Sequence, residues 1–225
     1  MRLIVFDIDG TLTQTDGIDE TCFVRAFQEE FGLTGINTDW GLYSSCTDAA
    51  IGRDLLTGRY GREPEPEEIE RVRGRFVSLL EAARERDPQD FEEMRGAAEI
   101  LRRLRAEPDT RLALATGGWG ASARLKLQAA GLDTADLPFA SSDDAPTREE
   151  IVQLAIERSG PGPFERIVAV GNGLWDLKAA RNLGLAFVGI ASGDRAERLR
   201  QEGASHVVED FGDLEGFLQC LAEAA

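Results

Sequence analysis

Short runs of branched apolar residues recur along the chain, and stretches with apolar residues at helical spacing separate them. The strongest runs are typical of buried parallel strands and lie at residues 2–6, 111–115 and 166–170. Weaker runs predict further strands at residues 137–140, 186–190 and 206–208. Helical patterns alternate with the strands, at residues 97–105, 121–130, 148–158, 176–183, 195–202 and 213–222. This alternation predicts βαβ units, and therefore an α/β fold with a Rossmann-like parallel sheet core and helices on both faces.

The alternation is interrupted after the first strand, because the next convincing strand begins only near residue 111. Apolar residues between them recur at helical spacing, as in Phe23, Phe27 and Phe31. The pattern predicts an inserted α-helical cap domain over residues 15–93, so that the core comprises residues 1–14 and 94–225. A chain of 225 residues is long enough to bury a core in this arrangement.

The charge balance narrows the choice of partners. The chain carries 41 Asp and Glu against 25 Lys and Arg, a formal net charge of -16. A surface this acidic repels nucleic acid and anionic lipid, so we expect no nucleic-acid and no membrane partner. An anionic ligand such as phosphate would need a local positive field, from a metal ion, backbone N–H groups or one well-placed cation.

Several further features suit a cytoplasmic protein. They do not bear on its oligomeric state, which we expect to be a monomer or a homodimer. No stretch approaches the ~20 apolar residues that span a bilayer, and no basic, signal-like leader precedes the first strand. Three widely spaced cysteines favour free thiols over a disulfide or zinc site, at Cys22, Cys46 and Cys220. The single histidine, His206, lies near a predicted short strand, which disfavours a Ser-His-Asp triad.

The segment FDIDGTLT, residues 6–13, places two carboxylates just beyond the first predicted strand. Asp7 and Asp9 are two residues apart, so on an extended backbone both face the same side. Two adjacent acids repel each other unless a cation or a proton lies between them. The pair predicts a nucleophile and a general acid/base that share a magnesium site, since turn capping would explain one aspartate but not both.

The sequence DIDGT after an apolar strand resembles the first motif of the haloacid dehalogenase-like (HAD) hydrolases, most of which are phosphatases. Two other segments appear in the order that the family shows. ALATGG, residues 113–118, resembles the second motif, and VGNGLWD, residues 170–176, resembles the fourth. A helical insertion directly after the first motif is similar to the family's helical-cap class.

The resemblance implies a role for each matching residue. Asp7 would attack phosphorus and form an aspartyl-phosphate. Asp9 would protonate the leaving alcohol and then deprotonate the hydrolytic water. The hydroxyl of Thr116 and the backbone N–H of Gly117 would hold the phosphoryl oxygens. These roles describe a phosphoryl-transfer site at the carboxyl end of the sheet.

The resemblance also implies a Mg²⁺ cofactor. Its ligands would be the Asp7 side chain, the Asp9 backbone carbonyl and the turn that carries Asn172 and Asp176. The family's fourth motif usually supplies an acidic pair, whereas Asn172 is an amide. An amide keeps an oxygen that magnesium accepts but removes one negative charge, so we expect weakened metal binding.

The third motif, a lysine in most family members, is where the chain departs from the pattern. Arg148 stands near a predicted helix start, where the family usually places its cation, whereas Lys126 comes earlier, in the helix after Thr116. We favour Arg148, because a guanidinium can bind phosphate and Asp7 bidentately. Lys126, or neither residue, remains an alternative. Asp143 and Asp144 either orient Arg148 or cap its helix.

These features predict a magnesium-dependent phosphatase of a small phosphorylated metabolite, in which the cap excludes water and selects the leaving group. Trp40 and Tyr43 in the insertion are candidates for substrate contact, and Trp119 and Trp175 for pocket walls or core packing. A sugar-phosphate mutase of the same cap class is one alternative. A weakly active phosphate-binding protein is another, because Asn172 replaces a metal acid. Dehalogenase activity is disfavoured, since that branch lacks the second aspartate.

Overall fold

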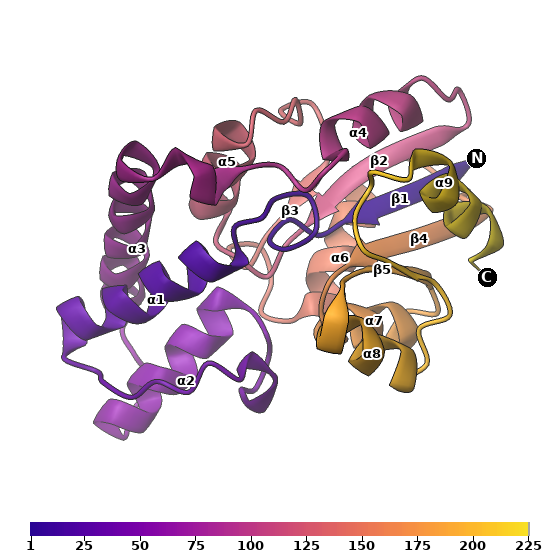
Figure 1. The fold of residues 1–225 in the computed structure, drawn as a ribbon. Helices are drawn as coiled ribbons and strands as arrows, with labels where there is room; N and C mark the ends of the chain where they lie inside the picture. The colour runs from indigo at the N-terminus through magenta and orange to yellow at the C-terminus, as the bar shows by residue number, and fades with distance from the viewer. Residues whose placement is uncertain (225) are drawn as a thin grey trace.

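The computed structural model describes residues 1–224 and contains a six-stranded parallel sheet (Figure 1). Its strands in chain order are β1 (Arg2–Phe6), β2 (Thr110–Ala115), β3 (Phe139–Ala140), β4 (Arg166–Gly171), β5 (Ala186–Ile190) and β6 (Val207–Val208). Across the sheet the order is β3-β2-β1-β4-β5-β6. The chain winds outward from β1 to β3 and then returns to the other side of β1. The carboxyl ends of β1 and β4 therefore flank the switch point at which such sheets bind ligands.

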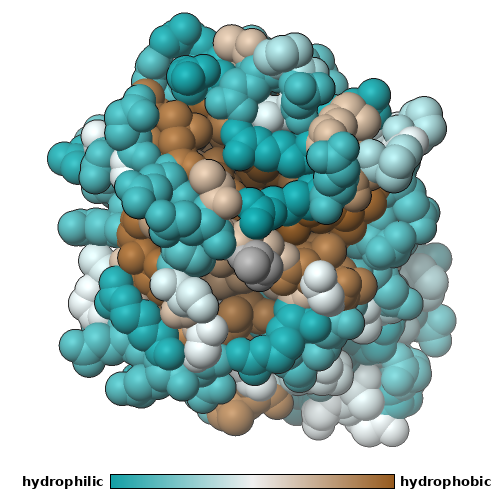
Figure 2. Space-filling view, turned by 90° about the vertical axis from the view of Figure 1, so that its right-hand side faces the viewer, coloured by the Kyte–Doolittle hydropathy of each residue, from teal (hydrophilic) through white to brown (hydrophobic). Residues whose placement is uncertain are grey.

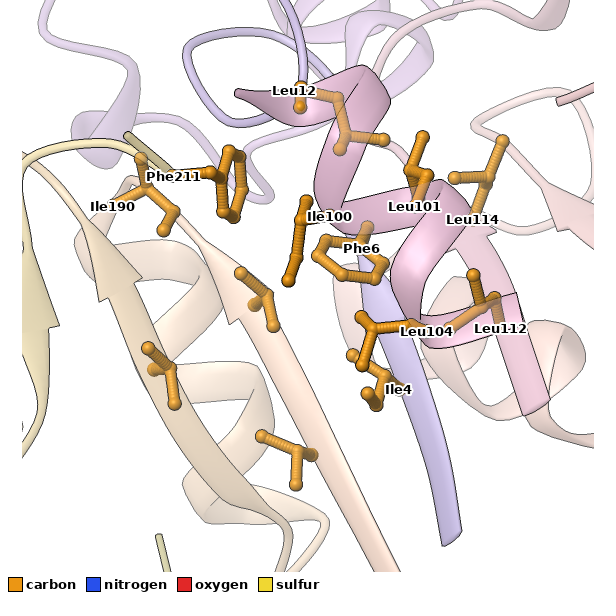
Figure 3. Close-up of a cluster of buried hydrophobic side chains, with 14 of the residues drawn as sticks. Ile4, Phe6, Leu12, Ile100, Leu101, Leu104, Leu112, Leu114, Ile190 and Phe211 are labelled. Atoms are coloured by element: carbon orange, nitrogen blue, oxygen red, sulfur yellow. The ribbon is translucent and has the colours of Figure 1, made fainter. Parts of the chain in front are cut away.

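The sheet is covered on both faces because successive residues of β1 point to opposite sides. Ile4 and Phe6 pack in the cluster that contains Ile100 of α4 (Ala97–Arg105) (Figure 3). The same cluster contains Phe217 of α9 (Leu214–Glu223). On the other face, Leu3 and Val5 pack against α6 (Arg148–Arg158). The predicted α/β sheet with helices on both faces is confirmed.

The remaining core helices are α5 (Gly120–Ala129), α7 (Leu174–Asn182) and α8 (Gly193–Gln201). All the core helices begin and end within two residues of the patterns in the sequence. Strand β3 is shorter than predicted, with two residues in place of the expected segment 137–140. Pro138 has no backbone N–H for the ladder, which limits the pairing of this edge strand.

A group of helices lies to one side of the sheet, between β1 and β2 in the chain (Figure 1). It comprises α1 (Asp16–Phe31), α2 (Asp48–Tyr60) and α3 (Pro66–Arg86), with the 3-10 helices η1 (Trp40–Leu42) and η2 (Pro88–Phe91). We call residues 16–91 the helical lobe. Its apolar cluster is separate from the clusters on the sheet and includes Phe23, Phe27 and Phe76. The division into two domains at residues 15 and 93 remains a prediction.

The two connections between the sheet and the helical lobe run side by side. The N–H of Gln14 donates to the carbonyl of Glu92 at 2.9 Å, and the N–H of Met94 donates to the carbonyl of Leu12 at 2.8 Å. The lobe therefore leaves the sheet and returns to it at one place. That place lies directly after the loop that carries Asp9.

The surface is largely polar. Figure 2 shows hydrophilic side chains over most of one face, with apolar atoms visible between them. Large apolar side chains that are clearly exposed among residues 1–224 are Leu42, Tyr60 and Leu174. Within the same residues, no helix combines the length and the apolar character that crossing a membrane requires.

Candidate active site

The sequence motifs meet at the carboxyl edge of the sheet, as their positions at strand ends predict. Asp7 follows β1, Thr116 follows β2 and Asn172 follows β4. A cavity of about 840 Å³ lies between these strand ends and the helical lobe, and all three residues line it. Arg148 and Asp9 line it as well. The structure thus brings residues from distant parts of the chain around one cavity.

Asp7 is nearly buried, with 6% of its surface exposed. Its Oδ1 accepts a hydrogen bond from Arg148 Nη1 at 2.9 Å, and its Oδ2 accepts one from the Thr11 hydroxyl at 3.2 Å. Burial raises the pKa of Asp7 to about 7, and the neighbouring Asp176 carboxylate adds to this rise, while Arg148 opposes it. Ionisation of Asp7 therefore depends on the positive charge beside it.

Arg148 joins three parts of the structure through one guanidinium group. It is the first residue of α6, directly after Thr147, whose hydroxyl caps the helix by accepting the N–H of Glu150. Its Nη1 donates to Asp7 and, at 3.0 Å, to Asp176 Oδ1. Its Nε donates to the carbonyl of Cys46 in the helical lobe at 3.0 Å. Neither Asp143 nor Asp144 pairs with Arg148, because they pair instead with Arg73 and Arg158.

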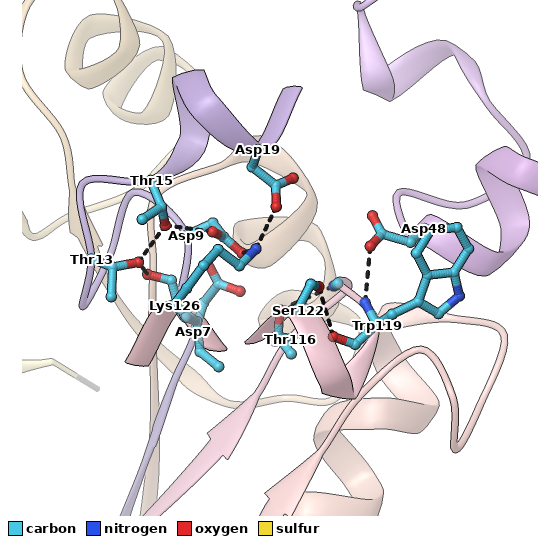
Figure 4. Close-up of polar contacts among 12 residues, drawn as sticks. Asp7, Asp9, Thr13, Thr15, Asp19, Asp48, Thr116, Trp119, Ser122 and Lys126 are labelled. Carbon is cyan, nitrogen blue, oxygen red and sulfur yellow. Dashed lines mark hydrogen bonds and ion pairs between the residues drawn. The ribbon is translucent and has the colours of Figure 1, made fainter. Parts of the chain in front are cut away.

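Lys126, the alternative cation, also reaches the site but contacts a different carboxylate. Its Nζ lies 2.7 Å from Asp9 Oδ2 and also pairs with Asp19 of α1 (Figure 4). The sequence treats Lys126 and Arg148 as competitors for one place, whereas the structure gives them separate partners. The helical spacing could have indicated that Lys126 is buried, because it lies on the same face of α5 as the apolar residues Ala123 and Leu127.

Asp9 is held on its other side by a threonine. The hydroxyl of Thr15 donates to Asp9 Oδ1 at 2.6 Å, and a second hydroxyl, from Thr13, lies 2.6 Å from that of Thr15 (Figure 4). Nothing in the sequence pattern assigned a role to Thr13, Thr15 or Asp19. Only their position shortly after Asp9 indicates that they lie nearby.

The loop after β2 offers polar groups to the cavity. Thr116, Gly117 and Gly118 all line it, and the Thr116 hydroxyl accepts the N–H of Gly118 at 3.0 Å. A Cβ at Gly117 would lie 2.6 Å from the Cys46 carbonyl oxygen and 2.7 Å from Arg148 Nε. Glycine is therefore required at this position by close approach. The N–H groups of Thr116 and Gly118 donate within the protein, so the groups of this loop that suit an anionic ligand are the Thr116 hydroxyl and the N–H of Gly117.

The start of α2 binds the same loop, which the sequence did not indicate. The N–H of Asp48 donates to the Gly117 carbonyl at 2.7 Å, and Asp48 Oδ2 accepts the N–H of Trp119 at 2.9 Å (Figure 4). The Thr47 hydroxyl donates to the carbonyl of Pro146 at 3.0 Å. From the sequence alone, Thr47 could be expected only to cap a helix, and not to contact Pro146. These contacts hold the helical lobe against the floor of the cavity.

The turn after β4 is built around Asp176. Its Oδ2 accepts the N–H groups of Asn172 and Gly173, at 3.1 and 2.9 Å, so the carboxylate is fixed by the start of its own helix. The Asn172 side chain packs against Gly10, where an added Cβ would lie 1.9 Å from Asn172 Nδ2. With a φ of 68°, Gly10 also adopts a conformation that favours glycine. The first and fourth motifs are therefore in direct contact.

The donor atoms around this turn suit a hard divalent cation. They comprise the carboxylates of Asp7 and Asp176, the Asn172 amide oxygen and the Asp9 backbone carbonyl, all of them oxygen ligands of the kind that Mg²⁺ prefers. Burial raises the pKa of Asp176 as well as that of Asp7, and the guanidinium of Arg148, which bridges the two carboxylates, opposes both rises. A metal ion at this turn would share the two carboxylates with Arg148. Residues 1–224 contain no cluster of three or more His, Cys, Asp or Glu side chains that could hold a metal ion by themselves. Here an amide stands beside two acids, and the set fits magnesium.

The aromatic candidates divide between core and cavity. Trp119 is 1% exposed and packs between the rings of Phe23 and Phe76, at centroid distances of 5.7 and 5.8 Å. Trp40 and Trp175 line the cavity. Trp119 therefore joins α5 to the helical lobe, whereas the other two tryptophans border the cavity.

Comparison with known proteins agrees with this arrangement. The model of the haloacid dehalogenase-like hydrolase family matches residues 1–184. A hydrolase from Pseudomonas syringae has the same fold, with a TM-score of 0.77 at 23% identity over 100% of both chains. CbbY from Rhodobacter sphaeroides in complex with phosphate gives 0.67 at 22% identity, covering 94% of this chain and 95% of that chain.

A variant of the same CbbY, in complex with xylulose-(1,5)bisphosphate, gives a TM-score of 0.69 at 20% identity and covers 95% of this chain and 97% of that chain. No curated protein is significantly similar to the chain in sequence. At these identities the structural likeness demonstrates a common fold, while the family match covers most of the chain. The motifs at the strand ends, the shared fold and the match over residues 1–184 together show that the chain belongs to the haloacid dehalogenase-like hydrolases.

Proposed function

We propose that this hydrolase is a magnesium-dependent phosphatase that acts on a small phosphorylated metabolite through an aspartyl-phosphate. The observation that carries the proposal is the contact of Arg148 with the buried carboxylate of Asp7 beside the Thr116–Gly118 loop. A nucleophile, a cation and anion-binding groups thus meet in one cavity. The phosphate and the sugar bisphosphate bound by CbbY support a ligand of this chemical class.

In the proposed reaction, an oxygen of Asp7 attacks phosphorus while the bond from phosphorus to the leaving oxygen breaks. Asp9 gives its proton to that leaving oxygen. Water then attacks the aspartyl-phosphate, Asp9 accepts a proton from the water, and inorganic phosphate leaves with Asp7 restored. Arg148 and the loop of Thr116 hold the phosphoryl oxygens throughout, where the charge develops.

Magnesium would be held by Asp7, the Asp9 carbonyl, Asn172 and Asp176, and when bound it would offset the negative charge of the phosphoryl group. The acidic chain needs such a local positive charge to accept an anion. The helical lobe lines the cavity opposite these groups, and its closure over a bound substrate would exclude water. Within this scheme Arg148 serves as the cation of the third motif.

Asn172→Asp is expected to lower the magnesium concentration that gives half-maximal phosphatase activity, without lowering kcat. A unit charge pair at ~4 Å contributes ~1 kcal/mol in water and ~4 kcal/mol at an effective dielectric of 20, so binding should tighten roughly 5- to 1000-fold. Magnesium titration of activity measures the change. Gln128→Glu, at an exposed position of α5, makes the same change from amide to carboxylate away from the cavity and should leave the titration unaltered. An unchanged or weaker magnesium dependence in Asn172→Asp would exclude this turn as the metal site.

Arg148→Ala is expected to raise KM and lower kcat together, because the guanidinium would contact both the bound phosphate and the transition state. A hydrogen bond to a charged group contributes ~1.5–3 kcal/mol, so kcat/KM should fall roughly 10- to 100-fold. Steady-state kinetics measure the loss, with Arg158→Ala at the other end of α6 as the control. If Lys126→Ala produces this combined effect and Arg148→Ala does not, Lys126 is the third-motif cation.

The test of the function itself is phosphate release from a panel of phosphorylated metabolites and an aryl phosphate, with magnesium present and after its removal by EDTA. We expect magnesium-dependent release from at least one small phosphate monoester, and none from Asp7→Asn. Retention of the phosphoryl group on a rearranged sugar would show a mutase instead. Binding of phosphate without turnover of any compound would show a phosphate-binding protein.

A further inference from the structure

Lys126 is a buried cation that the proposed reaction leaves without a role. Its side chain is 0% exposed, and its charged group contacts Asp9 and Asp19. A buried lysine is costly unless its charge is compensated, and one carboxylate would be sufficient to balance it. Here two carboxylates meet it, one from the loop after β1 and one from helix α1 of the helical lobe (Figure 4).

Both oxygens of Asp9 are engaged in this arrangement. Lys126 Nζ lies 2.7 Å from Oδ2, and the Thr15 hydroxyl lies 2.6 Å from Oδ1 (Figure 4). A carboxyl group bound on both oxygens cannot rotate freely about its last side-chain bond. Asp9 also lines the cavity, so its orientation relative to a bound substrate is set by these two neighbours.

The ionic contact also connects Asp9 to the helical lobe. Asp19 is one helical turn from the start of α1, directly after the paired connections between lobe and sheet. The ammonium group of Lys126 pairs with one carboxylate from the core and one from the lobe, so its position depends on both.

We propose that Lys126 is a positioning residue for proton transfer, which orients the Asp9 carboxyl group toward the leaving oxygen, and that Asp19 of the helical lobe holds Lys126 in place. The inference rests on the proposed function, in which Asp9 protonates the leaving oxygen. When the proton has moved and the bond from phosphorus to that oxygen has broken, Asp9 is a carboxylate. Lys126 and Thr15 are placed to bind it in that form.

The proposal is tested by the dependence of kcat/KM on the leaving group. This constant reports the steps up to release of the alcohol, and a 4-nitrophenolate leaves with little need for a proton, whereas a more basic phenolate needs one. Lys126→Met, which replaces the ammonium group by an apolar group of similar length, should lose little with 4-nitrophenyl phosphate. With phosphates of progressively more basic phenols, the loss should grow toward the lower end of the roughly 10²- to 10⁴-fold range of general acid catalysis.

The chain offers a matched control, because its other lysine, Lys178, lies exposed on α7. Lys178→Met should leave kcat/KM unchanged for every phenol. Lys126→Met alone leaves two neighbouring carboxylates without their cation, which lowers stability. The double variant Lys126→Met/Asp19→Asn restores the charge balance. It should unfold near the wild-type temperature and still show the steeper dependence on the leaving group, since nothing then binds Asp9 Oδ2.

The outcomes separate this proposal from the proposed function. The positioning role would be overturned if Lys126→Met lost kcat/KM equally for all phenols, or if the double variant showed the wild-type dependence on the leaving group. Phosphate release by the wild-type protein would still support the phosphatase in either case. Wild-type protein that releases phosphate from no member of the series would overturn both. Asp19→Asn alone retains Lys126 but removes the carboxylate that holds it on the lobe side. A dependence on the leaving group steeper than that of the wild type would support the part assigned to Asp19, and a wild-type dependence would contradict it.

Discussion

Asp7→Asn is expected to abolish phosphate release while the protein remains folded. An amide cannot attack phosphorus, yet asparagine has the shape of aspartate and keeps an oxygen that accepts the hydrogen bond from Arg148. Burial raises the pKa of Asp7 to about 7, well above its value of 3.8 in an unfolded chain. The folded state therefore favours the protonated form of Asp7. The stability that this preference contributes is lost as the pH rises from about 4 to about 7. At a pH above 7 and without magnesium, removing the charge should not lower stability.

The measurements are phosphate release with 4-nitrophenyl phosphate and thermal unfolding at a pH above 7 in EDTA. Asp133→Asn, on an aspartate that pairs with Arg105 at the surface, is a control for the chemical change and should retain full activity. Clear residual turnover in Asp7→Asn would remove Asp7 as the nucleophile. Loss of folding in Asp7→Asn would show instead that its charge supports the structure.

Asp9→Asn is expected to slow both chemical steps without preventing substrate binding. The asparagine cannot give a proton to the leaving oxygen or take one from water, and each proton transfer contributes roughly 10²- to 10⁴-fold to the rate. Lys126 would keep its contact with Asp19 in the variant, so we expect a folded protein. For aryl phosphates, kcat/KM should fall most where the phenol is most basic, and kcat should fall for every member.

Single-turnover kinetics check this prediction by separating release of the phenol from release of phosphate. In Asp9→Asn, 4-nitrophenyl phosphate should release its phenol faster than it releases phosphate, because the aspartyl-phosphate forms and is then hydrolysed slowly. Wild-type rates that are equal for leaving groups of very different basicity would argue against Asp9 as the acid. So would a variant with unchanged kcat.

The fold could be predicted from the sequence because its signals are local. The apolar runs of β1, β2 and β4 are buried on both faces of the sheet, so they stand out from the helical spacing around them. Short edge strands carry less signal, and β3 was predicted at twice its length. The packing of the helical lobe against the sheet was not predictable, since it depends on side chains such as Trp119 that read equally as wall or core.

The site could be predicted as far as its motifs lie at strand ends. Asp7, Thr116 and Asn172 meet because parallel strands end at one edge, which follows from topology alone. The contacts of Lys126 with Asp9, 117 residues away, and of Arg148 with the Cys46 carbonyl depend instead on how α5 and α2 are rotated. No pattern in the sequence specifies such rotations. Under the proposed function, in which Arg148 is the third-motif cation, an arginine in place of lysine has a physical reason, since a guanidinium can bind Asp7 and the lobe backbone at once.

The adjacent connections of the helical lobe bear on how enzymes of this architecture diversify. Gln14 pairs with Glu92 and Leu12 with Met94, so the two ends of the lobe lie within hydrogen-bonding distance of each other. A unit attached in this way can be exchanged during evolution for one of different length, because its closure costs little more as it grows. The register of β1 on β2, which ends at Phe6 and Leu114, would be untouched. Under the proposed function, in which the lobe selects the substrate, such an exchange would alter substrate preference while Asp7 and Asp9 stay where they are.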